Sequence, residues 1–334
     1  MRLTKAAAML FVAIVIGAPA GADPYHLRIG WVAPGADLAT MMFAKPGLAR
    51  HAGQSYIPEL LHFDGTSTAM QGLATGDLDL AALAYSTFAL GIINAGMQDL
   101  RVIGDEFQDG VPGYHTNAFV VRTDSPIRTV DDLKGKTLAS NERGSAIDMA
   151  LRAMLAKHDL QDPRDVTVIQ VPFPDQKALL RDRKVDLITA VVPFGFDPEL
   201  RGFSRPLFLQ VDAIGRSQMI LRVARAAFLQ EHRDVMVDFM EDYLRTLHYL
   251  LDPAHHDDAV ALLAKVTGQK PSFFEDWAFT KQDYYRDPAA LPNLDALQSN
   301  IDLQRQLGFL RTGVDVNAHA DLSIVKEAAA RLSD

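Results

Sequence analysis

The sequence of 334 residues contains no cysteine. This absence excludes disulfide bonds, thiolate nucleophiles, iron–sulfur clusters and cysteine-based zinc sites, so any chemistry has to use oxygen and nitrogen groups. Basic residues are also few: 33 Lys and Arg face 42 Asp and Glu, which gives a formal net charge of -9. A chain without a basic surface binds phosphate backbones poorly, and we therefore expect no nucleic acid partner.

Long apolar runs are scarce after residue 22. Stretches such as 78–84 are much shorter than the about 20 residues that a membrane-spanning helix needs. The amino terminus differs, because Arg2 and Lys5 precede an uncharged run at 6–18, and Ala20-Gly21-Ala22 offers a small-residue cleavage site. Residues 1–22 are therefore predicted to be a cleaved secretory signal peptide; the alternative, a membrane anchor, is disfavoured by the shortness of the run. No cysteine follows it for lipid attachment.

Short β-rich runs alternate with helical patterns in the first two thirds of the chain, which is typical of parallel strands joined by crossover helices. A turn-rich break, Thr123-Asp124-Ser125-Pro126, separates two such series and predicts two α/β lobes in succession. Strands are expected at 26–32, 57–63, 78–84, 100–104, 118–122, 137–140, 166–171 and 185–191, and helices at 36–52, 66–75, 145–157 and 175–183.

From about Ser217 the pattern changes to helices without strands between them, after an apolar run at 219–223. The longest, 233–251, places apolar residues on one helical face: Met236, Phe239, Met240, Tyr243, Leu244, Leu247 and Leu251. Further helices are expected at 257–267, 294–307 and 322–332. We expect this tail to pack on the first lobe, with the chain crossings at 118–122 and 211–219 acting as paired hinges.

Several segments resemble the solute-binding proteins of ABC importers of the nitrate, taurine and aliphatic-sulfonate type. They are Leu27-Arg28-Ile29-Gly30-Trp31, Gly65-Thr66-Ser67 through Gly76-Asp77-Leu78-Asp79-Leu80-Ala81, residues 95–103, residues 127–137, Gly144-Ser145-Ala146, and Gln306-Leu307-Gly308-Phe309 followed by residues 321–326. The order and spacing of these segments behind a signal peptide carry the resemblance.

The resemblance implies an α/β type II periplasmic-binding-protein fold, with two mixed sheets flanked by helices and joined by two hinge strands. Lobe 1 would comprise 23–117 and 215–334, including the C-terminal helices, and lobe 2 would comprise 118–214. It further implies a monomeric periplasmic protein without catalytic activity, cofactor or metal. Its partners would be a small organic anion, either a carboxylate or a sulfonate, and a cognate ABC permease in the inner membrane.

The candidate anion-binding residues follow predicted strands, because ligands of open α/β sheets sit beyond the carboxyl ends of the strands. Gly65-Thr66-Ser67 begins a helix whose free N–H groups and positive dipole end suit an anion, although plain N-capping explains the same residues. Asn141 and Arg143-Gly144-Ser145 occupy the equivalent place in the second lobe. Arg143 could hold a carboxylate or sulfonate through two hydrogen bonds, or could instead pair with Glu142 or Asp148 at the surface.

Aromatic residues at strand ends could sandwich the body of a ligand, although a core position explains them equally well. These are Trp31, Tyr85 and Phe194. His115 and Asn117 lie just before the first hinge, where polar residues can reach a cleft, and a structural histidine is the alternative. The complete set of candidate ligand-binding residues is Trp31, Gly65, Thr66, Ser67, Tyr85, Ser86, Thr87, His115, Asn117, Asn141, Arg143, Gly144, Ser145, Ala146 and Phe194.

Three segments resemble phosphate-binding, catalytic or metal-binding motifs but do not match them fully. Gly135-Lys136-Thr137 lacks the Gly that a phosphate-binding loop needs, because position 130 is Val. The segment 65–69 imitates a nucleophile elbow but ends in Ala. His255-His256-Asp257-Asp258 has metal-ligand residue types whose directions diverge on a helix. Two other hypotheses remain open: an enzyme on the same fold, such as a pyrimidine-precursor-type synthase or a hydrolase, and a ligand-sensing receptor for a membrane kinase.

Overall fold

The structure, a computed structural model, describes residues 23–333. The predicted signal peptide lies outside the described residues. Five strands form the largest sheet, in the order β2-β1-β3-β10-β4: β1 (Tyr25–Trp31), β2 (Tyr56–His62), β3 (Leu80–Ala84), β4 (Leu100–Asp109) and β10 (Ser217–Arg225). β1 is parallel to β2 and β3, whereas β10 is antiparallel to β3 and β4, so the sheet is mixed.

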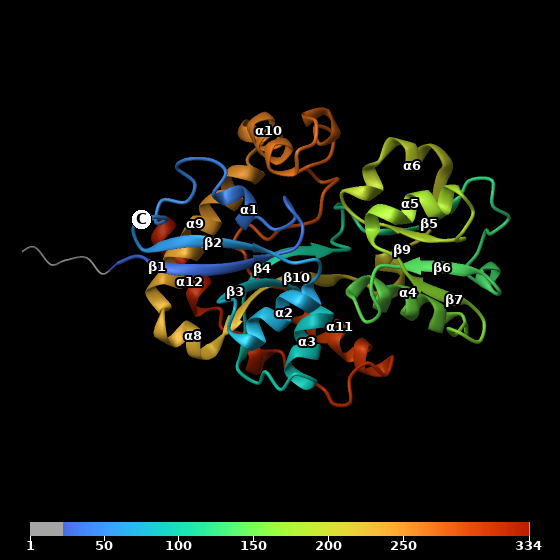
Figure 1. The fold of residues 1–334 in the computed structure, drawn as a ribbon, viewed down its shortest axis with the longest axis horizontal. Helices are drawn as coiled ribbons and strands as arrows, with labels where there is room; N and C mark the ends of the chain where they lie inside the picture. Colours follow the sequence, from blue (N-terminus) through green and yellow to red (C-terminus); the bar gives the residue numbers. More distant parts are fainter. Residues whose placement is uncertain (1–22, 334) are drawn as a thin grey trace, which may run out of the picture.

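The remaining strands gather at the other end of the molecule (Figure 1). An antiparallel sheet of order β8-β5-β9 contains β5 (Ala118–Arg122), β8 (Ile188–Ala190) and β9 (Ser204–Leu209), and a parallel pair contains β6 (Thr137–Ser140) and β7 (Thr167–Gln170). A single bridge between Leu138 and Leu187 joins the two ladders. We refer to the five-stranded sheet with its helices as the first sheet group and to these strands with theirs as the second sheet group.

Helices cover both faces of the five-stranded sheet because its central strands are apolar on both faces. On β3, Leu80 packs into the core below α9 (Arg233–Leu251), while Ala81 packs into the core that contains α3 (Tyr85–Ile93). The other helices of this group are α1 (Ala39–Met42), α2 (Thr66–Thr75), α8 (Ala226–Glu231), α10 (His256–Thr267), α11 (Leu294–Gln306) and α12 (Ser323–Ser333). The expected packing of the C-terminal helices on this sheet is confirmed.

The second sheet group carries α4 (Ala146–Lys157), α5 (Phe173–Arg181), α6 (Pro198–Phe203) and α7 (Gln210–Ile214), with a short 3-10 turn, η2 (Phe194–Phe196). The long helix expected at 36–52 is wrong, since only the single turn α1 forms there. Pro46 lacks the N–H group that a helix interior requires, and Gly47 takes a positive φ of 88°, so the chain after α1 turns away instead. The strand β9 and helices α6 and α7 were not predicted from the sequence.

The chain passes twice between the two sheet groups, and the two passages are hydrogen-bonded to each other. The backbone N–H of Asn117 donates to Asp109 Oδ2 at 2.8 Å, and the N–H of Gln210 donates to the Asn117 carbonyl at 2.7 Å. The Gln210 side chain donates in turn to Ser217 Oγ at 3.0 Å. These are the crossings that the sequence indicates; their role as hinges stays a prediction.

β2 is an edge strand of the large sheet and exposes Ile57, Leu60 and Leu61 by more than a third. The Phe63 N–H donates to the Trp31 carbonyl, so odd-numbered residues of this segment point their backbone groups towards β1. The nitrogen of Pro58 therefore lies on the outer side of the strand. Within residues 23–333 no helix is both long enough and apolar enough to span a membrane.

Candidate ligand-binding pocket

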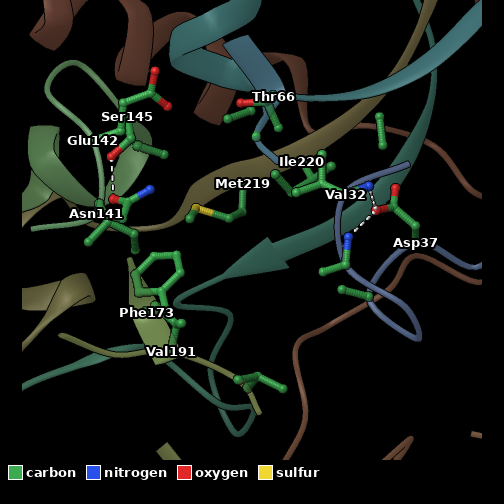
Figure 2. Close-up of a pocket in the computed structure, with 18 of the residues that line it drawn as sticks. Val32, Asp37, Thr66, Asn141, Glu142, Ser145, Phe173, Val191, Met219 and Ile220 are labelled. Carbon is green, nitrogen blue, oxygen red and sulfur yellow. Dashed lines mark hydrogen bonds between the residues drawn. The ribbon is translucent and has the colours of Figure 1, made fainter. Parts of the chain in front are cut away.

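A cavity of about 320 Å³ lies between the two sheet groups and is lined by residues from both. Thr66 comes from the first group, Asn141, Glu142 and Ser145 come from the second, and Met219 lies on β10 (Figure 2). The position agrees with the rule that ligands of α/β sheets bind where the strands end at their carboxyl side. The size suits a small organic molecule.

Four helix N-termini converge on this cavity, and each belongs to a helix that follows a strand. They are the starts of α2 at Gly65, α3 at Ala84, α4 at Ser145 and α5 at Pro172. Only Ser145 caps its helix with a side chain, accepting from the Asp148 N–H at 3.1 Å. Each helix start carries roughly half a positive charge, so the cavity has a partial positive potential from backbone groups alone.

The charged side chains of the described residues that line the cavity are all acidic: Asp37, Asp64 and Glu142, with no Lys, Arg or His among them. Asp37 is 4 % exposed, and its Oδ2 accepts from the N–H groups of Val32 at 2.9 Å and Ala33 at 3.0 Å. Burial, with a smaller contribution from Glu106, raises the pKa of Asp37 to about 7. An anion in this pocket therefore has backbone N–H groups and hydroxyls as its partners.

The rest of the lining is mainly apolar. Phe173 and Phe194 stack with ring centroids 6.2 Å apart, and Phe107 stacks on Tyr284 at 4.4 Å. The Tyr284 hydroxyl donates to Asn117 Oδ1 at 2.6 Å and accepts from the Val192 N–H at 3.3 Å, which ties the C-terminal segment to the second sheet group. These surfaces can hold a flat or branched hydrocarbon body next to the helix N-termini.

The structure brings part of the predicted set together. The candidates that line the cavity are Gly65, Thr66, Asn141, Ser145, Ala146 and Phe194. The others lie outside the lining: Trp31, Ser67, Tyr85, Ser86, Thr87, His115, Asn117, Arg143 and Gly144. Thr87 supports the lining from behind, because its hydroxyl shares a hydrogen bond of 2.8 Å with Thr66. Asn117 does so through Tyr284.

Several candidates outside the lining pack against other groups of the protein. The Trp31 ring lies 4.4 Å from the His62 ring, with the two planes tilted by 45°. Tyr85 is fully buried, and its hydroxyl donates to the Ala146 carbonyl at 3.3 Å. Ser86 is also fully buried. His115 packs against Phe196, and burial lowers its pKa to about 4.

Arg143 does not extend into the cavity as the sequence interpretation expected. Its side chain is 63 % exposed, lies 3.9 Å from Asp162 and covers the Phe309 ring at 5.6 Å. The adjacent Gly144 takes a positive φ of 84°, which turns the loop so that Ser145, rather than Arg143, faces Asn141.

The sequence reasoning missed several lining residues. Pro172 and Phe173 follow the strand β7, so the rule that identified 65–67 could have found them. Asp37 follows the end of β1, so the same rule could have found it as well. Met219 lies within β10 and Tyr284 lies in the loop before α11, and neither carried such a signal.

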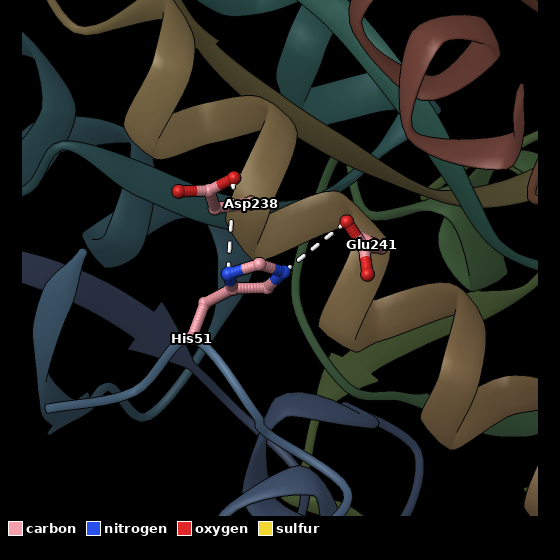
Figure 3. A group of neighbouring side chains, drawn as sticks. All are labelled: His51, Asp238 and Glu241. Atoms are coloured by element: carbon pink, nitrogen blue, oxygen red, sulfur yellow. Dashed lines mark ion pairs between the residues drawn. The ribbon is translucent and has the colours of Figure 1, made fainter. Parts of the chain in front are cut away.

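A separate cluster contains His51, Asp238 and Glu241 (Figure 3). The two ring nitrogens of His51 face different carboxylates, at 3.9 Å for Asp238 and 3.1 Å for Glu241. Both carboxylates also pair with arginines, Asp238 with Arg331 and Glu241 with Arg245. The arrangement is therefore an ion-pair cluster that ties α9 to the segment after α1 and to α12.

No curated protein matches the sequence. Solved structures do match across nearly the whole chain. The periplasmic aliphatic sulphonate binding protein SsuA from Escherichia coli has a TM-score of 0.71 and 19 % identity over 91 % of this chain and 99 % of its own. The periplasmic nitrate-binding protein NrtA from Synechocystis PCC 6803 has a TM-score of 0.72 and 14 % identity over 92 % and 89 %.

A desulfurization enzyme, DSZB, is also similar, with a TM-score of 0.64 and 16 % identity over 92 % of this chain and 99 % of its own. At identities this low, the structural matches show a shared fold. They confirm the expected periplasmic-binding-protein architecture. The model of the NMT1-like family matches residues 20–264, and the chain belongs to this family.

Proposed function

We propose that this protein is the periplasmic solute-binding component of an ABC importer and captures a small organic acid between its two sheet groups. The observation that carries the proposal is the convergence of four helix N-termini, two from each sheet group, on one cavity of about 320 Å³. Such ends bind carboxylate and sulfonate oxygens through backbone N–H groups. A ligand shared by both groups would favour the arrangement in which they are close together.

The apolar part of the lining supports an organic ligand rather than a simple inorganic anion. Phe173, Phe194 and Met219 offer surface that only a hydrocarbon body would use. Micromolar affinity needs about 8 kcal/mol, which a few charge-assisted hydrogen bonds and the burial of one ring can supply.

The family and the fold neighbours support the transport role. Two of the neighbours are named as periplasmic binding proteins for aliphatic sulphonates and for nitrate. The predicted signal peptide supports export, and the partner would be a permease of the inner membrane. A receptor that reports to a membrane kinase would use the same pocket. The transport and sensing roles differ in the membrane protein, a permease or a kinase, that binds the closed form.

An enzyme is the second candidate function, because the desulfurization enzyme DSZB has the same fold. The absence of cysteine in this chain excludes a thiol nucleophile. An enzyme would convert the bound compound, whereas a binding protein releases it unchanged.

The test uses the secreted form, residues 23–334, after denaturation and refolding to remove any resident ligand. A panel of carboxylates and sulfonates is screened by thermal unfolding, and each hit is titrated calorimetrically and then recovered for mass spectrometry. We expect one-to-one binding, a rise in the unfolding temperature of several degrees at about 100 times the Kd, and recovery of the compound unchanged. A panel without a single hit, or a hit that is converted, would contradict the proposal.

A further inference from the structure

Glu142 is a pocket residue whose carboxylate reaches across to the opposite sheet group. It lies in the loop between β6 and α4, and its Oε2 is 3.6 Å from the position that a β-carbon on Gly65 would occupy. Gly65 is the N-cap residue of α2 in the first sheet group. Figure 2 shows Glu142 with Asn141 and Ser145 on one side of the cavity, with Thr66 of α2 nearby.

The start of α2 has no anionic cap of its own. Its N-cap makes no side-chain hydrogen bond, and the first turn contains no acidic residue. The Thr66 hydroxyl is bonded to Thr87, and the Thr68 hydroxyl donates to the Gly65 carbonyl. The partial positive charge of this helix end is therefore directed at the pocket and at whichever anion lies there.

The Glu142 carboxylate is free to act as that anion. Over the described range, 23–333, its two oxygens make no hydrogen bond and no ion pair, although most partly buried acids of the chain have a cationic or N–H partner. Asp162, Asp165 and Asp197 are examples. Asp64, which directly precedes the N-cap, adds a second negative charge at the same end of the cavity.

We propose that Glu142 is a specificity-determining residue whose carboxylate competes with the acidic group of the ligand for the N-terminus of α2. The pocket then admits a ligand with one negative charge and discriminates against a ligand with two. The four helix ends together supply about two positive charges, and the carboxylates of Glu142 and Asp64 offset part of them. A second ligand charge would meet like charge at close range without a basic side chain to balance it.

The experiment compares three probes with the same ring and different charge: benzenesulfonamide, benzenesulfonate and benzene-1,3-disulfonate. Each is titrated into the wild type, Glu142→Gln and Glu275→Gln. The last variant is the matched control, because it makes the same change in net charge at an exposed residue that does not line the pocket.

We expect the wild type to bind the monosulfonate at least tenfold more tightly than the disulfonate. Glu142→Gln should raise the affinity for the disulfonate about tenfold and for the monosulfonate severalfold, and should change that for the neutral sulfonamide less than twofold. Glu275→Gln should leave all three unchanged. An equal effect of Glu142→Gln on the three probes, or no effect on the charged ones, would overturn the proposal.

The inference rests on the proposed function for its ligand class, and a measurement without ligand separates the two. Hydrogen exchange of the amides in the first turn of α2, residues 66–69, should accelerate at least threefold in Glu142→Gln relative to Glu275→Gln, because the helix end loses its anion. Unchanged exchange would overturn the role of Glu142. If no organic acid binds but exchange accelerates, the proposed function fails while the charge competition at α2 stands.

Discussion

The indole of Trp277 lies flat on the ring of Phe196, with centroids 4.4 Å apart and planes inclined by 8°. Phe196 belongs to η2 in the second sheet group, whereas Trp277 packs among the core residues that surround α9 and α10. The contact thus joins the two groups away from the chain crossings. The guanidinium of Arg201 covers the other side of Phe196 at 4.3 Å.

Replacement of Trp277 by Ala should destabilise the protein by about 3–5 kcal/mol, because it leaves a cavity in a buried aromatic cluster. Chemical unfolding followed by circular dichroism measures the loss. Trp31→Ala is the matched control: this second tryptophan is only partly buried and contacts the exposed His62 ring, so its removal should cost less than half as much. Equal losses would contradict the structural role of the Trp277 contact.

Replacement of Tyr284 by Phe removes a hydroxyl that holds both Asn117 and the Val192 N–H. We expect a loss of about 1–3 kcal/mol, because buried polar groups are left without partners while the ring stacking on Phe107 is kept. Tyr285→Phe is the control, since its hydroxyl makes one longer contact, at 3.2 Å, with Asp287. A smaller loss of unfolding free energy for Tyr284→Phe than for Tyr285→Phe would show that the Asn117 contact does not stabilise the protein.

Thr66 and Arg143 were both expected from the sequence to bind the ligand, but only Thr66 lines the cavity. Thr66→Val keeps the shape but removes the hydroxyl, and should weaken binding of the tightest acid of the panel about fivefold or more. Arg143→Ala should change the affinity less than twofold, because the guanidinium lies over Phe309 rather than in the lining. Calorimetric titration measures both affinities. A larger loss for Arg143→Ala than for Thr66→Val would show that Arg143 contacts the ligand.

The stability of the protein should depend on pH through Asp109. Burial raises the pKa of this carboxyl to about 7, although Thr116 and Asn117 donate to it. Between about pH 4 and 7 the folded protein keeps a proton that the unfolded chain has lost, so Asp109 makes the folded state less stable as the pH rises through this range.

Asp109→Asn removes this titration and keeps an oxygen acceptor, and the Thr116 hydroxyl can accept instead of donating. Relative to wild type, the variant should therefore gain stability from pH 4 to 7, by an amount on the order of 2–4 kcal/mol, and the difference should be constant above pH 8. Asp37, Asp105 and His115 titrate in both proteins, so their contributions to the pH dependence cancel in the difference. Parallel stability curves for wild type and variant would contradict the prediction.

The elements with strong periodicity were predictable from the sequence. The helix expected at 233–251 forms as α9. A helix places its seven regularly spaced apolar residues on one face, which can then pack on the core. The helix expected at 36–52 does not form over its full length. Its apolar residues Leu38, Met41 and Met42 are buried as a helical face would be, but Pro46 and Gly47 end the helix after one turn.

The pocket was predictable only where it follows a strand end. Thr66 and Ser145 were found because a strand, a turn and a helix start occur together in the sequence. Tyr284 and Met219 line the same cavity through packing between segments far apart in the chain, and no local sequence pattern predicts such packing.

β2 has no neighbouring strand on its outer side in the sheet. Three exposed aliphatic side chains on a free strand would otherwise offer a template for another chain to continue the ladder, the first step towards fibrils. Pro58 interrupts the outward row of donors in the middle of the strand, so an incoming backbone finds a gap in its register. Pro58 therefore makes this edge a poorer hydrogen-bonding partner for the edge of a second chain.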